Sequence, residues 1–286
     1  MFIIQNMHFT NNNRTNIIFT QEEVRSMASY VIHYTTGKKL LEKLNISKEE
    51  QAGFLLGNLI ADSLKTIGNE TNPEIIRKLK EQYREQIQNE KTATHFRCKK
   101  DFDKNIQLCN LKKFLETYSK FMDNPTVLGY FFHLFTDNHF FKNVFDDAFV
   151  CLDNNGKVTD KWKDTTQYKV LKDGKIVTPK EFWTEENIYG DYTKMNKLVL
   201  TNYKINFDVD LLRKGLKLYP NPGIKEVNFE NIESVIRETN SYIKDSETAD
   251  ISNLKIFDSN KILEFIDEVG NKFIDQNNEY IKKYKR

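Results

Sequence analysis

The stretch Gly129-Tyr-Phe-Phe-His133-Leu-Phe-Thr-Asp137 lies inside a longer segment, residues 125–145, whose apolar residues recur at helical spacing. A helix here places His133 and Asp137 on one face, one turn apart, because they are separated by four positions. An imidazole and a carboxylate that converge from one helix are suitable ligands for a divalent metal. The stretch therefore predicts a helix that carries part of a metal site.

Helical spacing of apolar residues continues over most of the chain on both sides of this segment. Two capping boxes, Thr20–Glu23 and Ser47–Glu50, mark the starts of helices, and Asn72-Pro73 marks a third start. The predicted helices cover residues 24–44, 48–62, 73–87, 106–122, 125–145, 192–203, 209–218, 229–243 and 259–284. This pattern predicts a mainly α fold, a helical bundle.

The middle of the chain has a different character. Residues 168–178 alternate apolar and polar side chains on both sides of Asp173-Gly174, which is typical of a β-hairpin turn. We expect a small β-hairpin inserted in an otherwise helical protein. Asp191 precedes the next helical segment, where a helix N-cap is the favoured interpretation over a role in a site.

Composition and pattern together predict the domain organisation. The first 19 residues are polar and rich in Asn, with no helical period, and we expect a peripheral N-terminal extension there. No internal repeat or low-complexity linker interrupts residues 20–286, so we predict a single helical metal-binding domain. The net charge of +2 is too small to predict a polyanionic partner, and nucleic acid is not expected.

The cysteines and the apolar runs indicate the compartment. The three cysteines are odd in number and form no Cys-x-x-Cys pair, which argues against a disulfide framework and against a cysteine zinc site. No apolar run approaches the roughly 18 residues of a membrane span, so no transmembrane segment is expected. The N-terminus lacks the pattern of a secretory signal. These features predict a cytoplasmic protein.

Three further candidate ligands lie beside apolar packing segments. His33 flanks the stripe of the first predicted helix, Asp62 ends the stretch Gly57-Asn-Leu-Ile-Ala-Asp62, and His95 lies in a segment that breaks the helical period. A single residue of this kind is usually a satisfied core residue or a helix cap. A buried His or Asp without a partner is costly, however, so several of them beside one core favour a shared site.

In order and context, these segments resemble the zinc-dependent phospholipase C family, especially its small bacterial members without a secretion signal. The resemblance covers residues 27–145, and its specific parts are the stretches that end at Asp62 and Asp137. It implies a helical bundle of the phospholipase C-like type. It also implies one zinc held by Asp62, His95, His133 and Asp137, and a second zinc that shares Asp137 and uses His33.

The chain departs from this family after the helix of His133. No histidine follows His139, which lies off the face of His133 and Asp137 and is interpreted as a flanking residue. Secreted family members use three metals, with further histidines supplied along the chain. We therefore expect zinc as the cofactor, in one or two ions, with another divalent metal as an alternative.

The resemblance implies a metal-dependent phosphoester hydrolase that activates water and acts on a small phosphoester or a phospholipid headgroup. The general acid and base are not assigned to any residue. The alternative is a non-catalytic helical metal-binding protein that acts as an interaction module. Cleavage of nucleic acid is a weaker third hypothesis, since no basic stripe with interleaved aromatic residues is present.

Overall fold

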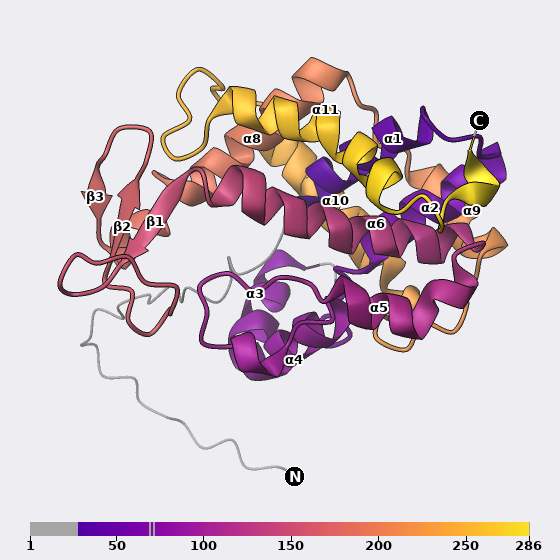
Figure 1. Ribbon diagram of the computed structural model, residues 1–286, viewed down its shortest axis with the longest axis horizontal. Coiled ribbons are helices and arrows are strands. Elements are labelled where there is room, and N and C mark those ends of the chain that lie inside the picture. Colours follow the sequence, from indigo (N-terminus) through magenta and orange to yellow (C-terminus); the bar gives the residue numbers. More distant parts are fainter. Residues whose placement is uncertain (1–27, 69, 71, 286) are drawn as a thin grey trace, which may run out of the picture.

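Two buried helices, α2 (Lys48–Ile60) and α6 (Pro125–Phe140), pack against each other at the centre of the fold (Figure 1). Glycines make this close approach possible. A Cβ atom on Gly57 would lie 2.0 Å from the carbonyl oxygen of Thr126, and one on Gly129 would lie 2.0 Å from that of Phe54. No side chain fits at these distances, so the two helices meet backbone to backbone. This contact fixes the register of His133 against α2.

Gly129→Ala is therefore expected to lower the free energy of unfolding by about 1–3 kcal/mol or more, because α2 and α6 must separate to admit the methyl group. Urea denaturation measures this change. Gly270→Ala is the matched control: Gly270 is also buried inside a helix, but its nearest neighbours to an added Cβ lie at 3.8 Å. That variant should be neutral or more stable by up to about 1 kcal/mol. Equal effects of the two substitutions would contradict this packing.

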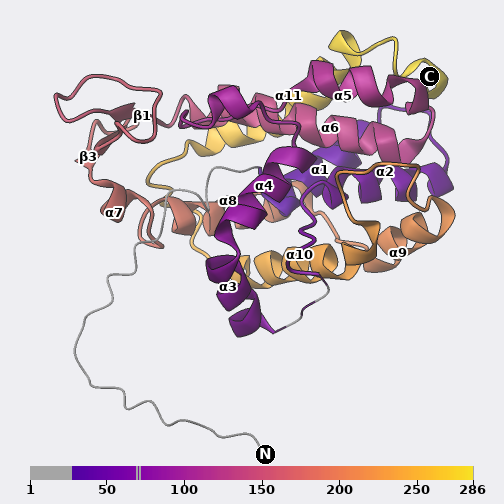
Figure 2. The same ribbon diagram turned by 90° about the horizontal axis from the view of Figure 1, so that it is seen from below.

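The computed structural model describes residues 28–68, 70 and 72–285, and it confirms a mainly α fold. The other helices surround the central pair on several sides (Figures 1 and 2). They are α1 (Tyr30–Leu41), α3 (Pro73–Gln82), α4 (Arg84–Thr94), α5 (Leu111–Tyr118), α7 (Pro179–Phe182), α8 (Ile188–Tyr203), α9 (Val209–Leu218), α10 (Ile232–Ser246) and α11 (Ser259–Gln276). One contiguous apolar core joins residues from Ala28 to Tyr284.

The predicted hairpin is present as β2 (Gln167–Val170) and β3 (Ile176–Val177), joined by a turn at Gly174 with φ of 73°. A third strand, β1 (Phe149–Leu152), pairs with β2 and was not predicted. Its four residues are all apolar, with no alternation of apolar and polar side chains. The sequence pattern of β1 is therefore the same as that of the end of a helical segment. The antiparallel order β1-β2-β3 places this small sheet at one end of the molecule (Figure 1).

Several helix boundaries differ from the predicted ones. The predicted helix 73–87 is broken at Tyr83 into α3 and α4, and the side chains of Ile75 and Tyr83 are exposed. These helices pack against a small separate apolar cluster rather than against the main core. The buried members of this cluster are Leu64, Ile67 and Ile87. The last helix ends at Gln276 rather than at residue 284, and the chain then closes with a 3-10 turn.

The N-terminal predictions lie outside the described residues. This applies to the capping box Thr20–Glu23 and to the extension over residues 1–19, whose peripheral role stays a prediction. In the described part of the chain, no helix is both long enough and apolar enough to cross a membrane. Cys98, Cys109 and Cys151 are all free thiols.

Candidate metal centre

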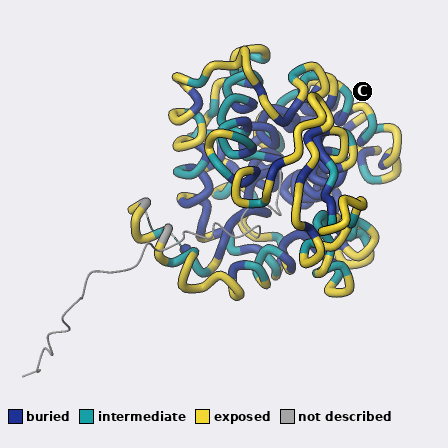
Figure 3. The backbone as a smooth tube through the Cα atoms, turned by 90° about the vertical axis from the view of Figure 1, so that its left-hand side faces the viewer, coloured by how far each residue is buried: buried dark blue, intermediate teal, exposed yellow. Residues whose placement is uncertain are grey.

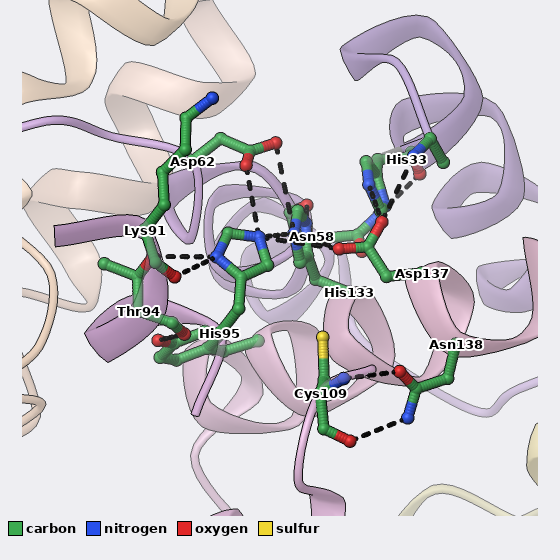
Figure 4. A network of polar contacts seen from close by, with 12 residues as sticks. His33, Asn58, Asp62, Lys91, Thr94, His95, Cys109, His133, Asp137 and Asn138 are labelled. Carbon is green, nitrogen blue, oxygen red and sulfur yellow. Dashed lines mark hydrogen bonds and ion pairs between the residues drawn. The ribbon is translucent and has the colours of Figure 1, made fainter. Parts of the chain in front are cut away.

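The structure brings together all five side chains that the sequence singled out (Figure 4). His33 comes from α1, Asp62 follows the end of α2, His95 caps the C-terminus of α4, and His133 and Asp137 come from α6. The four residues other than Asp62 have no exposed surface, and Asp62 is 6% exposed. Segments that are far apart in the sequence thus deliver three imidazoles and two carboxylates to one buried place.

Four of these residues enclose one small volume. The Nε2 atom of His95 lies 3.3 Å from Nε2 of His133 and 3.3 Å from Oδ1 of Asp62. Oδ2 of Asp137 lies 3.5 Å from Nε2 of His95 and 3.6 Å from Nε2 of His133. A tetrahedral zinc site with bonds of about 2.0–2.2 Å has ligand atoms separated by about 3.3–3.6 Å. These four separations match four of the six edges of such a tetrahedron. The edge between Asp62 and His133 is longer, because the nearest Asp62 oxygen lies 3.9 Å from Nε2 of His133.

Backbone carbonyls fix the tautomers of two imidazoles. Nδ1 of His133 lies 2.9 Å from the carbonyl oxygen of Asn58, and Nδ1 of His95 lies 3.0 Å from that of Lys91. A carbonyl oxygen only accepts, so both Nδ1 atoms carry the proton and both Nε2 atoms expose a lone pair. The two lone pairs face each other at 3.3 Å, where they repel unless a cation lies between them. Carbonyl-anchored histidines of this kind are typical of metal ligands.

Several polar atoms of the cluster are buried without a hydrogen bond among the described residues. They are Nδ1 and Nε2 of His33, Oδ1 of Asp62 and Oδ2 of Asp137. Each unsatisfied buried polar atom costs about 1–3 kcal/mol, and more when it is charged. The cluster is therefore unfavourable as a set of protein atoms alone, and a bound cation would satisfy it.

His33 forms a second group with His133 and Asp137. Its Nε2 atom lies 3.2 Å from Oδ1 of Asp137, and its ring stacks on that of His133 with centroids 3.8 Å apart. The backbone N–H of Ala28 also donates to Oδ1 of Asp137, at 3.2 Å. The two oxygens of Asp137 thus face different neighbours, Oδ1 toward His33 and Oδ2 toward His95 and His133. This arrangement is compatible with a carboxylate shared by two ions.

Burial controls the protonation of the cluster. It lowers the pKa of His33 to about 4, and with the nearby Arg97 it lowers the pKa of His95 to about 3. Burial, together with the ring of His33, lowers the pKa of His133 to about 4. For the same reason, burial raises the pKa of Asp62. The imidazoles are therefore neutral at pH 7, which is the form that binds a metal.

The metal-free protein should lose stability as the pH falls from about 6.5 to about 4. In this window the three histidines take up protons only when the chain unfolds, which costs about 1.4 kcal/mol per pH unit for each of them. The raised pKa of Asp62 acts in the opposite direction but involves a single group. Urea denaturation of chelator-treated protein between pH 7.5 and 5 measures the slope, and His33→Gln should reduce it. Stability that stays constant over this range would contradict the neutral, buried state of the histidines.

The sequence did not identify the residues that support the cluster. Asn58 joins three helices, since its carbonyl accepts from His133 and its amide donates to the carbonyl of His33 at 2.5 Å. The hydroxyl of Thr94 lies 2.8 Å from Nδ1 of His95. The sequence signal for Asn58 is a polar residue in the middle of an apolar stretch. In the structure Asn58 is fully buried, and a buried amide needs a specific hydrogen-bond partner, which the sequence does not identify.

A cleft of about 430 Å³ borders the cluster at Asp62. Figure 2 shows α3 and α4 beside the helices α8 and α10, and all four contribute to its walls. Cationic side chains come from α3 and α4, and tyrosines and carboxylates come mainly from the other side. The lining includes Lys80, Arg84, Lys91, Tyr30, Tyr189, Tyr192, Tyr242, Glu185, Glu238 and Asp245. Burial and the nearby Lys80 lower the pKa of Lys91 to about 8, so this amine is still mainly protonated at pH 7.

Two residues considered at the sequence level lie outside the cluster. Asp191 is not an N-cap, because Asn187 holds that position in α8. It is fully buried, and its carboxylate accepts hydrogen bonds from the backbone N–H groups of residues 255–257. His139 is partly buried, and its ring lies against that of Phe135, with centroids 4.2 Å apart, on the flank of α6.

Comparison of the chain with models of known protein families, with curated proteins and with solved structures found no match. What the structure itself establishes is a mainly helical protein with two overlapping groups of buried His and Asp side chains that could hold a metal ion.

Proposed function

We propose that this protein is a metal-dependent phosphoester hydrolase, similar to the phospholipase C family, that uses one or two zinc ions to activate water. The proposed metal ligands are His33, Asp62, His95, His133 and Asp137. The proposed substrate is a small phosphoester or a phospholipid headgroup. The three free cysteines favour a reducing compartment, and we place the protein in the cytoplasm.

One observation carries the proposal. The Nε2 lone pairs of His95 and His133 face each other at 3.3 Å, with carboxylate oxygens of Asp62 and Asp137 at similar distances from His95. Neutral imidazoles and buried carboxylates do not satisfy one another in this geometry without a cation. Two nitrogen and two oxygen donors at these separations are a set that zinc prefers.

The surroundings of the cluster support a phosphoester as the substrate. A divalent ion supplies Lewis acidity and lowers the pKa of water, which suits attack on phosphorus. The cleft beside Asp62 adds the cations Lys80, Arg84 and Lys91, which attract a phosphate group. Asp137, whose two oxygens face different neighbours, is positioned to hold two ions close together.

The alternative is a non-catalytic metal-binding protein that acts as an interaction module. The near-complete burial of the candidate ligands favours it, since closed four-ligand sites are commonly structural. The cleft at Asp62 favours the hydrolase instead, because a catalytic site needs an open path for substrate. The two hypotheses predict the same metal content but different reactivity.

Hydrolysis of bis(4-nitrophenyl) phosphate tests the proposal. The protein is purified without chelator, divided, and assayed as isolated, after removal of metal, and after readdition of zinc. We expect activity in the first and third samples only. His139→Ala, on the flank of α6, should keep both metal and activity. Bound metal without hydrolysis of this or other phosphodiesters would favour the interaction module, and activity that survives metal removal would exclude the proposed chemistry.

A further inference from the structure

The end of the molecule that carries the β-sheet exposes several large apolar side chains. We call residues 149–177 the sheet end; it faces the viewer in Figure 3, where much of its backbone is exposed. Its Val158, Ile176 and Leu171 are 72%, 52% and 45% exposed. These are the three most exposed large apolar side chains in the described part of the chain. Exposed apolar groups that gather on one projecting element mark a contact surface.

Lysines accompany each of these apolar side chains. Lys157 precedes Val158, Lys172 follows Leu171, and Lys175 precedes Ile176. All six lysines of the sheet end are exposed: Lys157, Lys161, Lys163, Lys169, Lys172 and Lys175. With four aspartates, the segment has a net charge of +2, which equals the net charge of the whole chain. The sheet end is therefore a basic segment, although it also carries four acidic side chains.

Strand pairing shows that this surface is separate from the core. Tyr168, Val170 and Val177 face inward and are buried. On the outward face, Lys169 lies opposite Ile176. A solvent-facing position on an edge strand usually carries a polar side chain, so an exposed isoleucine paired with a lysine favours a surface that meets an apolar and anionic partner.

An aromatic cavity of about 480 Å³ opens beside this surface. Val158 forms part of its wall, and Trp162, Trp183, Phe145 and Phe149 line it as well. Trp162 and Trp183 are the only tryptophans of the chain. Aromatic and aliphatic side chains next to lysines are typical of the boundary between lipid headgroups and acyl chains.

We propose that the sheet end docks on an anionic phospholipid bilayer, with the lysines on the headgroups and Val158, Leu171 and Ile176 inserted between them. Charge complementarity and the exposed aliphatic side chains favour lipid over nucleic acid, since the sheet end contains no arginine and its aromatic rings line the cavity. The surface does not include the metal cluster, and docking does not depend on hydrolysis.

Vesicle binding followed by tryptophan fluorescence tests the docking directly. The full-length protein is mixed with phosphatidylcholine vesicles, with or without phosphatidylglycerol, whose acyl chains are brominated. Trp162 lies in the sheet end and Trp183 lines the adjoining cavity, so bromine should quench the fluorescence with the anionic vesicles and much less with the neutral ones. Each lysine changed to glutamine should weaken binding roughly fivefold, and added salt should weaken it further.

The apolar contribution is tested with Val158→Asp/Ile176→Asp, which should weaken binding about tenfold or more. The matched control, Ile75→Asp/Leu218→Asp, changes similarly exposed side chains on α3 and α9 and should leave binding within about twofold. Absence of binding to anionic vesicles would overturn the proposal, and so would binding that both double variants weaken equally. A second result would also overturn the proposal: heparin binds as tightly as the vesicles, and Val158→Asp/Ile176→Asp does not change vesicle binding. The lysines would then bind a soluble polyanion. All measurements are repeated with chelator, so a failed hydrolase assay does not affect their outcome.

Discussion

His133→Ala should remove the bound metal and reduce hydrolysis of bis(4-nitrophenyl) phosphate by at least about a thousandfold, which corresponds to about 4 kcal/mol of transition-state stabilisation. The imidazole of His133 is central in the cluster, because its Nε2 atom faces His95, Asp62 and Asp137. Its loss removes one of the two imidazole nitrogens that lie beside both carboxylates and leaves Nε2 of His95 as the other. Metal content by mass spectrometry and hydrolysis are measured on the same preparation.

Two further variants make this test specific. Asp137→Asn keeps the size of the side chain and should also lose metal, because an amide oxygen is a weaker ligand than a carboxylate. His139→Ala should retain both metal and activity, since the His139 ring lies against Phe135 outside the cluster. Hydrolysis at the wild-type rate in folded His133→Ala would exclude this site as the catalytic centre.

Removal of metal should destabilise the folded protein. A ligand that binds only the native state stabilises it by about 4 kcal/mol when its free concentration is 1,000 times the dissociation constant. For a chain of this length, we expect chelation to lower the melting temperature by about 10 °C. The effect should be large because the cluster contains buried polar atoms that make no hydrogen bond among the described residues. Differential scanning calorimetry with and without chelator measures the shift.

The same scan on His133→Ala provides the control. This variant should melt at one temperature in both conditions, because it has no metal to lose. Calcium should not replace zinc in the chelated wild type, since calcium prefers six to eight oxygen ligands and the cluster offers three imidazoles. A melting temperature of the wild type that does not respond to chelator would show that the cluster is stable without a cation.

Much of the helical structure could be predicted because its signals are local. The capping box at Ser47 and the Asn72-Pro73 start are present as expected, since each depends on residues within one turn. The break at Tyr83 was missed because an unbroken helical period continues through it. The strand Phe149–Leu152 was missed because pairing with a distant segment, and not its own pattern, makes it a strand.

The candidate site was predictable to different degrees for different residues. His133 and Asp137 are related by helical spacing alone, so a single helix brings them together. Asp62 lies near them because Gly57 and Gly129 let α2 and α6 approach backbone to backbone, and His95 reaches them from the end of α4. Their convergence is a tertiary property, and the resemblance to a known family supplied that expectation. The support from Asn58 is also tertiary, since its partners belong to α1 and α6.

The location of a metal ion tests the central claim most directly. Crystals grown with zinc and measured at the zinc absorption edge give an anomalous peak at each zinc position. We predict a peak about 2.0–2.2 Å from Nε2 of His95 and of His133, and from one carboxylate oxygen each of Asp62 and Asp137. A fully ordered cluster without a peak, or zinc bound only elsewhere on the protein, would contradict it.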